Sequence, residues 1–180
     1  MSLTFVPVAT PQDQELLAQL AGAIWQEYWP AIIGQEQTDY MVEQFQSLEA
    51  IRRDMAEHDY EYWFCTVEPG ASSSPYTTEE GAPIVGFTGG HNEPETNRFF
   101  ISKIYLLASE RGKHYASRVI EFYIDLCRQR GQRAMYLTVN KYNELGIRAY
   151  KGKGFVTIDS VETDIGRGFI MDDYIMEKEA

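Results

Sequence analysis

The chain has 180 residues, of which 44% are hydrophobic and 13% aromatic, and its formal net charge is -11. This length and composition are typical of a single folded domain over residues 1–180 and exclude a disordered chain. The acidic balance argues against a nucleic-acid-binding protein, and no apolar run reaches the ~18 residues that span a bilayer.

The first residues do not show the basic stretch followed by an apolar stretch that marks a signal peptide. Cys65 and Cys127 lie in apolar surroundings, and their spacing fits neither a disulfide framework nor a metal site. We therefore expect two reduced core thiols, no metal, and a cytoplasmic protein that does not act at a membrane.

The chain opens with an expected strand and helix. Residues 3–9 favour a strand, and Pro7 places it at a sheet edge because proline cannot donate to a β-ladder. Apolar side chains then recur at helical spacing over residues 13–28, and we expect Pro30 to end that helix.

A second helix is expected over residues 36–56, with Ser47 as a candidate point of interruption. Residues 60–67 are rich in aromatic and β-branched side chains, which predicts a strand. Residues 68–83 are rich in Gly, Pro, Ser and Thr, which is typical of an exposed connector between two strands. The next strand, residues 84–91, contains glycines that could mark a bulge.

The remaining elements alternate in type, and the chain contains no internal repeat. They are strands over residues 99–107, 133–139, 154–161 and 168–177, and helices over residues 115–130 and 144–151. The order β-α-α-β-β-β-α-β-α-β-β predicts one mixed α/β (α+β) domain.

Positive charge is concentrated in one part of the sequence. Residues 111–153 contain ten lysines and arginines and three acidic residues, whereas the other 137 residues contain six basic and 24 acidic ones. A basic segment in an acidic chain indicates a localised site for an anion, and the alternative is a solvated helix face.

Residues 108–116 have the features of a phosphate-binding loop. A strand that enters a helix through a short glycine-containing turn directs backbone N–H groups and the positive helix end at one point. Arg111, Lys113 and Arg118 add positive charge there. Gly112 lacks the companions of a G-x-G-x-x-G fingerprint. A P-loop that begins at Gly146 would need Gly-Lys where the chain has Lys151-Gly152.

At these residues the chain resembles the GNAT superfamily of acetyl-CoA-dependent N-acetyltransferases. Arg111 and Ala116 match the family signature Arg/Gln-x-x-Gly-x-Gly/Ala, and His114 stands at its central glycine. Asn143 and Tyr150, followed by a Gly-Phe pair, extend the resemblance downstream. The two ends of the chain are also similar to a bacterial subgroup that includes polyamine acetyltransferases.

The resemblance implies a mixed, largely antiparallel sheet of about seven strands flanked by about four helices. It also implies acetyl-CoA as the cosubstrate, held by the phosphate-binding loop, the preceding strand and two downstream side chains. The cofactor contacts implied in this way are Ile104, Tyr105, Leu106, Arg111, Gly112, Lys113, His114, Tyr115, Ala116, Ser117, Asn143 and Tyr150.

Two of these residues receive catalytic roles from the resemblance. Tyr150 would protonate the departing thiolate or donate a hydrogen bond to it, since a phenol of pKa about 10 is a suitable acid for a thiolate of pKa about 8.5. The alternative is a tyrosine that packs its helix on the sheet. The backbone N–H of Leu106 would stabilise the oxyanion that forms on the acetyl carbonyl. Asn143 would lie near the pantetheine arm and also serve as a helix N-cap.

The general base stays open at this point. Residues 97–104, where some family members carry a carboxylate, contain none. A base that acts through water, or an acid such as Asp172 or Asp173, would serve. Those two are adjacent on an expected strand and point to opposite faces, so we expect one of them to be solvated. His91 and His114 are isolated histidines and weaker candidates.

Aromatic residues of the first two helices are candidates for the acceptor site, which these helices wall in the family. Trp25 shares their helical spacing, which equally favours a place in the core. In a pocket, such rings would hold a cationic amine by cation–π contacts. The expected substrate-binding residues are Tyr28, Trp29, Tyr40 and Asp172.

The function expected from the sequence is direct transfer of an acetyl group from acetyl-CoA to a primary amine within a ternary complex. A small cationic, polyamine-like acceptor fits the acidic chain. One alternative is acetylation of the amino terminus of a peptide or protein, and another is a non-catalytic module that senses acyl-CoA. The sequence leaves the oligomeric state open, with a homodimer as one possibility.

Overall fold

The computed structural model describes residues 2–180. Its strands are β1 (Thr4–Pro7), β2 (Glu61–Thr66), β3 (Ile84–Glu93), β4 (Arg98–Leu106), β5 (Ala134–Asn140), β6 (Val156–Gly166) and β7 (Phe169–Glu179). Its α-helices are α1 (Pro11–Tyr28), α2 (Pro30–Ile33), α3 (Gln35–Met41), α4 (Leu48–Glu57), α5 (Tyr115–Gln129) and α6 (Glu144–Gly152). A π-helical turn covers Val42–Gln46, and a 3-10 turn covers Ala108–Glu110.

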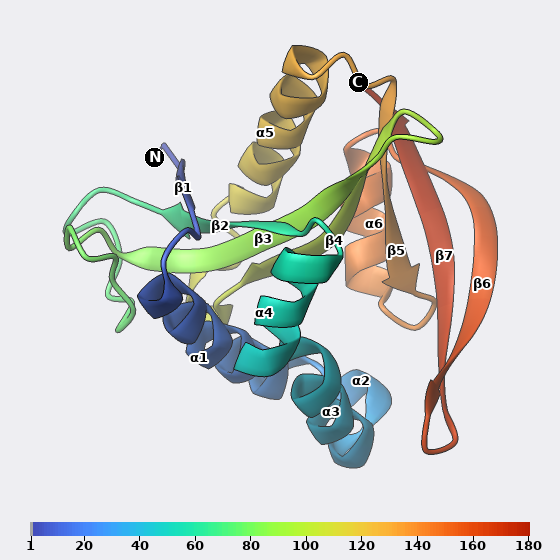
Figure 1. The fold of residues 1–180 in the computed structure, drawn as a ribbon, viewed down its shortest axis with the longest axis horizontal. Helices are drawn as coiled ribbons and strands as arrows, with labels where there is room; N and C mark the ends of the chain where they lie inside the picture. Colours follow the sequence, from blue (N-terminus) through green and yellow to red (C-terminus); the bar gives the residue numbers. More distant parts are fainter. Residues whose placement is uncertain (1) are drawn as a thin grey trace. The chain divides into compact units, whose positions relative to one another are not determined.

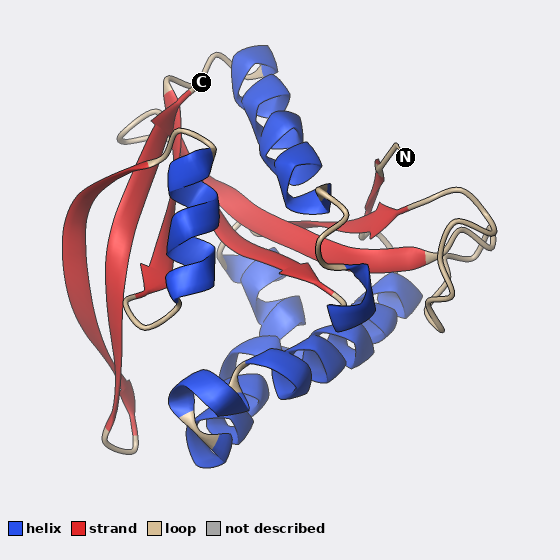
Figure 2. Cartoon of the chain, turned by 180° about the vertical axis from the view of Figure 1, so that it is seen from behind, coloured by secondary structure: helices blue, strands red, loops and turns tan. Residues whose placement is uncertain are grey.

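The seven strands form one sheet in the order β1-β2-β3-β4-β5-β7-β6 (Figures 1 and 2). β4 and β5 pair in parallel, whereas β1 with β2, β2 with β3, β5 with β7, and β6 with β7 pair antiparallel. The predicted mixed α/β class and largely antiparallel sheet are therefore confirmed. β1 lies at the edge where Pro7 placed it.

The first half of the chain contains more helices than the sequence pattern predicted. α1 begins with a capping box, in which Thr10 accepts a hydrogen bond from the Asp13 N–H, and it ends at Tyr28 as expected. Pro30 then opens the short α2, because the first position of a helix tolerates proline. With the second predicted helix divided as well, residues 2–180 contain six α-helices, so the expected four was too low.

The predicted helix over residues 36–56 is interrupted at Ser47, as expected. Ser47 is extended (φ -72°, ψ 162°), and its hydroxyl accepts a hydrogen bond from the Ala50 N–H at 3.2 Å, so it caps α4. The π-helical turn just before it was not predicted, because a π-turn leaves no distinct apolar period.

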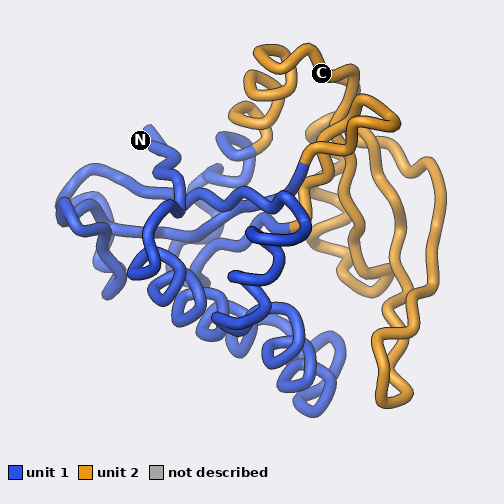
Figure 3. The backbone as a smooth tube through the Cα atoms, viewed as in Figure 1, with its two compact units in different colours: residues 1–91, 103–119 blue, residues 92–102, 120–180 orange. Residues whose placement is uncertain are grey.

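The chain divides into two compact units, shown in Figure 3. Unit 1 comprises residues 1–91 and 103–119, and unit 2 comprises residues 92–102 and 120–180. In unit 1, α1 and α4 pack their apolar faces against β2 and β3. The buried residues there include Leu17, Leu20, Ala21, Ile24, Ile51, Phe64, Ile84 and Phe87.

Two glycines of β3 lie where neighbouring groups leave no space for a side chain. A Cβ atom on Gly86 would stand 2.2 Å from the Tyr105 carbonyl oxygen, and one on Gly89 would stand 2.5 Å from Cδ1 of Tyr62. The pairing of β2 with β3 also shifts register near Gly86, so the irregularity expected in this strand is present.

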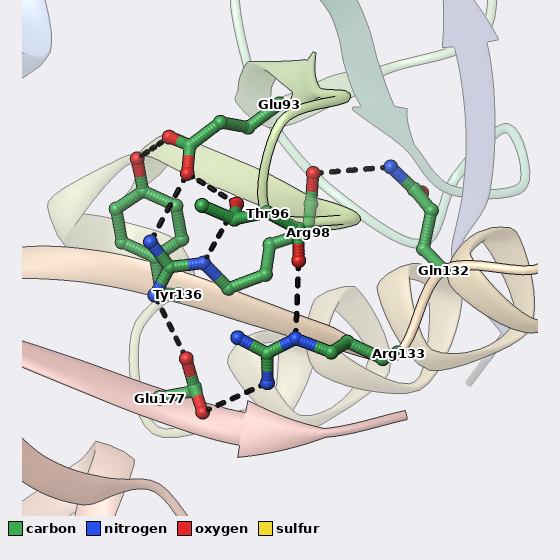
Figure 4. A network of polar contacts seen from close by, with 7 residues as sticks. All are labelled: Glu93, Thr96, Arg98, Gln132, Arg133, Tyr136 and Glu177. Carbon is green, nitrogen blue, oxygen red and sulfur yellow. Dashed lines mark hydrogen bonds and ion pairs between the residues drawn. The ribbon is translucent and has the colours of Figure 1, made fainter.

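Unit 2 has its own core and a polar network, which Figure 4 shows. In the core, the Phe99 and Tyr123 rings lie 5.3 Å apart. In the network, Arg98 donates to Glu93 at 3.0 Å and to Glu177 at 2.8 Å, and its guanidinium lies 4.1 Å from the centre of the Tyr136 ring. The Tyr136 hydroxyl also donates to Glu93. This network links the β3–β4 turn to β5 and β7.

Both cysteines are buried free thiols, as predicted. Burial raises the pKa of Cys127 to about 11 and raises that of Cys65 further, so neither is a thiolate at neutral pH. Across residues 2–180, no helix is long and apolar enough to cross a membrane.

Candidate functional site

The loop between β4 and α5, in unit 1, contains two residues in the left-handed backbone region. Gly112 has φ +80° and His114 has φ +63°. This conformation is strained for any residue with a Cβ atom and is the usual reason for a glycine. His114 therefore stands at the glycine position of the signature both in the sequence and in its backbone conformation. Its side chain is exposed.

The backbone of this loop has N–H groups available for a ligand. No hydrogen bond joins the N–H groups of residues 112–114 to another residue of the described chain. They lead directly into the first turn of α5, where the helix itself cannot pair the N–H groups and the helix dipole is positive. The Tyr115 side chain is buried, so of this residue only the backbone is available. The arrangement can hold a phosphate.

The two basic side chains of the loop have partners within unit 1. Arg111 Nη2 donates to the Leu106 carbonyl oxygen at 3.3 Å, and its guanidinium lies 4.8 Å from the centre of the Tyr28 ring. Lys113 Nζ lies 2.8 Å from the Glu110 carboxylate. Each of these two positive charges, expected to serve an anion, therefore already has a partner among its neighbours.

A buried carboxylate beneath the loop was missed in the sequence. Glu110 is 2% exposed, and it accepts hydrogen bonds from Lys113 and, at 2.6 Å, from the Ser72 hydroxyl. Ser72 belongs to the connector over residues 68–83, which was expected to be exposed. This hydrogen bond anchors part of the connector on the loop instead. The sequence did offer one signal for this carboxylate, because an acidic residue is unexpected inside a phosphate-binding loop.

The end of β4 that leads into the loop is half-buried at Ile104, Tyr105 and Leu106. The Tyr105 ring lies 5.6 Å from the ring of Trp25 on α1. These contacts fix the strand that would lie along a pantetheine arm, and they leave the backbone role of Leu106 a prediction.

The aromatic residues of the first helices fall into two groups. Trp25 and Trp29 are 3% and 8% exposed, and their rings stack 5.2 Å apart, so both are core residues in the structure. Their indole N–H groups have no hydrogen-bond acceptor among the described residues. Tyr28 and Tyr40 are half-buried, and the Tyr28 ring packs edge-on against Trp29 at 5.2 Å.

Unit 1 also buries a lysine that the sequence analysis did not single out. Lys103, on β4, is 7% exposed, and its Nζ donates to the Tyr62 hydroxyl at 2.8 Å and to the Phe45 carbonyl oxygen at 3.4 Å. Burial lowers the pKa of Lys103 to about 8. A single lysine in an apolar strand was the only signal in the sequence.

Unit 2 carries the two downstream residues of the resemblance. The Asn143 side chain accepts a hydrogen bond from the Gly146 N–H at 3.0 Å and caps α6, as predicted. A Cβ atom at Gly146 would stand 2.6 Å from the Asn143 amide nitrogen, which accounts for the glycine. Tyr150 lies on α6 and is half-buried, with its ring edge-on to Phe155 at 5.8 Å.

The two adjacent aspartates of β7 differ in exposure. Asp172 is partly exposed and lies 2.5 Å from Lys141 Nζ. Asp173 is 4% exposed, and one of its carboxylate oxygens has no hydrogen-bond partner in the described chain. Burial, together with the neighbouring Asp172 charge, raises the pKa of Asp173 to about 6. Asp172 is thus the more solvated of the two, in line with the expectation that the two side chains point to opposite faces.

The two candidate histidines stay apart from each other and from other ligating groups. The His91 ring packs against Tyr60 at 5.1 Å, and His114 is exposed in the loop. No group of three His, Cys, Asp or Glu residues within residues 2–180 could hold a metal ion.

The sequence model of the acetyltransferase (GNAT) family matches residues 21–155. No curated protein matches the chain. Three solved structures of similar fold cover nearly all of it. PaiA N-acetyltransferase from Thermoplasma acidophilum, in complex with coenzyme A, is 20% identical, with a TM-score of 0.74 and 100% of both chains covered.

A GCN5-related N-acetyltransferase, aminotransferase class-II, from Rhodopseudomonas palustris is 13% identical, with a TM-score of 0.76 and coverage of 100% of this chain and 97% of that one. Mutant forms of the spermidine/spermine N-acetyltransferase SpeG from Vibrio cholerae are 15% identical, with a TM-score of 0.63 and coverage of 99% and 95%. At these identities the likeness is one of fold.

Proposed function

The chain belongs to the acetyltransferase (GNAT) family, and we propose that it transfers an acetyl group from acetyl-CoA to the primary amine of a small acceptor in a ternary complex. The observation that carries the proposal is the loop after β4. Its left-handed residues, Gly112 and His114, precede a helix N-terminus, and the N–H groups of residues 112–114 have no hydrogen-bond partner in the described chain. A pyrophosphate is the ligand that such a turn favours.

The loop residues fit coenzyme A, which is bound in the PaiA structure of similar fold. Residues 111–117 would hold the pyrophosphate through backbone N–H groups, and Ile104–Leu106 would lie along the pantetheine arm. Arg111 would have to leave the Leu106 carbonyl oxygen to reach a phosphate, which is a small cost for an exposed side chain. Acetyl-CoA supplies the acyl group and the leaving thiolate.

We assign the chemistry to a backbone group and two side chains. The Leu106 N–H would donate to the acetyl oxygen as negative charge develops on it, and Tyr150 would donate a proton to the departing thiolate. Of the two aspartates, Asp173 is the better candidate for the base, because its pKa of about 6 allows it to exchange a proton near neutral pH. Asp172 is already neutralised by Lys141.

Two classes of acceptor are consistent with this chemistry. A polyamine-like amine is supported by the net charge of -11 and by the fold likeness to SpeG, a spermidine/spermine N-acetyltransferase. An amine that carries oxygen acceptors, such as the amino terminus of a peptide, is favoured by the buried cation of Lys103.

A thiol-release assay with acetyl-CoA and a panel of amines tests the proposal. Release of coenzyme A that depends on a primary amine, together with the acetylated amine in a mass spectrum, is the expected result. Tight acetyl-CoA binding without turnover on any amine of the panel would instead identify a module that senses acyl-CoA.

A further inference from the structure

Lys103 is a buried cation that no carboxylate of the described chain contacts, and the negative charge of Asp54 acts on it only from beyond ion-pair distance. Among the described residues, no carboxylate lies within 4.0 Å of its amino group. Its partners are neutral: the Tyr62 hydroxyl, the Phe45 carbonyl oxygen, and the faces of the Tyr62 and Tyr60 rings at 5.0 and 5.6 Å. Buried charges in proteins are normally paired, so an unpaired one points to a missing anion.

A second, independent observation concerns hydrogen-bond donors in the same unit. The indole N–H groups of Trp25 and Trp29 are buried and have no acceptor among the described residues. Trp25 packs against Tyr105 on β4. Tyr105 lies two residues from Lys103, so the side chains of Tyr105 and Lys103 point to the same face of the sheet, with their Cα atoms roughly 7 Å apart. Each unpaired buried donor costs free energy unless a ligand supplies an acceptor.

Unit 1 also contains one buried hydrogen-bond acceptor that has no partner in the described chain. This acceptor is Gln46 Oε1, and Gln46 follows Phe45, the residue whose carbonyl oxygen contacts Lys103. Both belong to the π-helical turn, a feature that is frequent at functional sites. The interior of unit 1 therefore contains a buried cation, two unpaired N–H donors and one unpaired amide oxygen.

We propose that this interior is an acceptor-binding site for an amine that carries a carboxylate. Lys103 would pair with the carboxylate, the indoles of Trp25 and Trp29 would donate to its oxygens, and Gln46 Oε1 would accept from a donor on the ligand. The inference rests on the proposed transfer to an amine and selects the acceptor class. A polyamine would bring a second cation beside a buried ammonium group and leave both indoles unpaired.

Three acceptors with the same four-carbon chain and a primary amine at one end test the inference: 4-aminobutanoate, 1,4-diaminobutane and butylamine. They end in a carboxylate, an ammonium group and a methyl group. We expect kcat/KM to be at least ~10-fold higher for 4-aminobutanoate than for 1,4-diaminobutane. Lys103→Met should reduce that ratio about 10-fold, whereas Lys151→Met, which removes an exposed lysine of α6, should preserve it.

A binding measurement separates this inference from the proposed catalysis. In a spectrum of the ¹⁵N-labelled protein, the indole signals of Trp25 and Trp29 should shift as 4-aminobutanoate is added, while that of Trp63 on β2 serves as an internal reference. Saturable shifts without any turnover would support the site and contradict the enzymatic proposal. Turnover on 1,4-diaminobutane at least equal to that on 4-aminobutanoate, with unshifted Trp25 and Trp29 signals, would overturn the inference.

Discussion

At the scale of single residues, His114 is unusual because a residue with a Cβ atom holds a conformation that favours glycine. Its φ of +63° lies next to a helix N-terminus, in the loop that we assign to the pyrophosphate. The family resemblance identified the position, but the sequence did not reveal that the backbone there is left-handed. The conformation explains how a histidine can replace the glycine without changing the path of the loop.

The cost of this conformation leads to a stability prediction. His114→Gly should raise the free energy of unfolding by about 0.5–1 kcal/mol, because the left-handed strain is removed and part of the gain is lost to chain entropy. His114→Ala keeps the Cβ atom and is the matched control, for which we expect no gain. Urea denaturation of the three proteins gives the comparison. An equal gain with alanine would mean that the imidazole, not the backbone, is unfavourable.

Lys103 gives a second prediction, which depends on pH. Its pKa falls from 10.5 to about 8 on folding, so the penalty for burying the charge is full below pH 8 and absent above pH 10.5. Lys103→Met should therefore raise the free energy of unfolding by about 1–3 kcal/mol at pH 7, and the gain should vanish near pH 10.5. Lower stability of the variant at pH 7 would show that the bond to Tyr62 outweighs the burial of charge.

Tyr150 carries the catalytic prediction at this scale. Tyr150→Phe should lower kcat by at least ~100-fold, because a general acid contributes about that much, and it should change the KM for acetyl-CoA little. The ring is kept, so its packing on Phe155 is retained. Steady-state kinetics with a good acceptor make the test. An unchanged kcat would remove Tyr150 from the mechanism and leave it a packing residue of α6.

At the scale of elements, the polar network of Figure 4 ties the β3–β4 turn to two later strands. Arg98, Glu93 and Glu177 have side chains that are only 16–24% exposed. Burial raises the pKa of Glu93, but hydrogen bonds from Thr96, Tyr136 and Arg98 outweigh it and hold the pKa below its usual value. Glu93 therefore adds stability above pH 4.5, which is lost as the pH falls.

Removing the arginine of this network should be costly. Arg98→Met leaves Glu93 without an ion-pair partner and Glu177 with Arg133 alone. We therefore expect a loss of about 2–3 kcal/mol at pH 7 and a smaller loss near pH 3, because the stability that Glu93 contributes is lost as the pH falls. Arg148→Met, at an exposed position of α6, should change stability by less than about 0.5 kcal/mol. Chemical denaturation at the two pH values decides. A loss that is independent of pH would assign the effect to packing on Tyr136.

The sequence predicted helices and strands well where the evidence for them lies in neighbouring residues. The spacing of Leu17, Leu20 and Ile24 identified α1, and Ser47 marked the interruption before α4. The Arg98 network could not be predicted, because its partners lie far apart in the sequence and meet only through strand pairing. The hairpin of β6 and β7 is likewise longer than expected, since Thr163 and Asp164 have no strand-like pattern but are held by partners on β7.

At the scale of the whole molecule, the concentration of positive charge in residues 111–153 was only a partial guide. At least five of its ten cations have partners within their own unit: Arg111, Lys113, Arg130, Arg133 and Lys141. A count of charges in a sequence cannot show which of them fold against acceptors. The resemblance to a family located the loop more sharply than the charge did, whereas the buried Lys103 and Asp173 required the fold.

Calorimetric titration of acetyl-CoA and of S-acetylpantetheine, which lacks the pyrophosphate and the nucleotide, tests the central claim about residues 111–117 most directly. If the loop binds the pyrophosphate, acetyl-CoA should bind at least ~10-fold more tightly, and the advantage should fall in Gly112→Val, because φ +80° strains a β-branched residue. Equal affinity of the two thioesters for the unaltered protein would contradict the assignment of this loop.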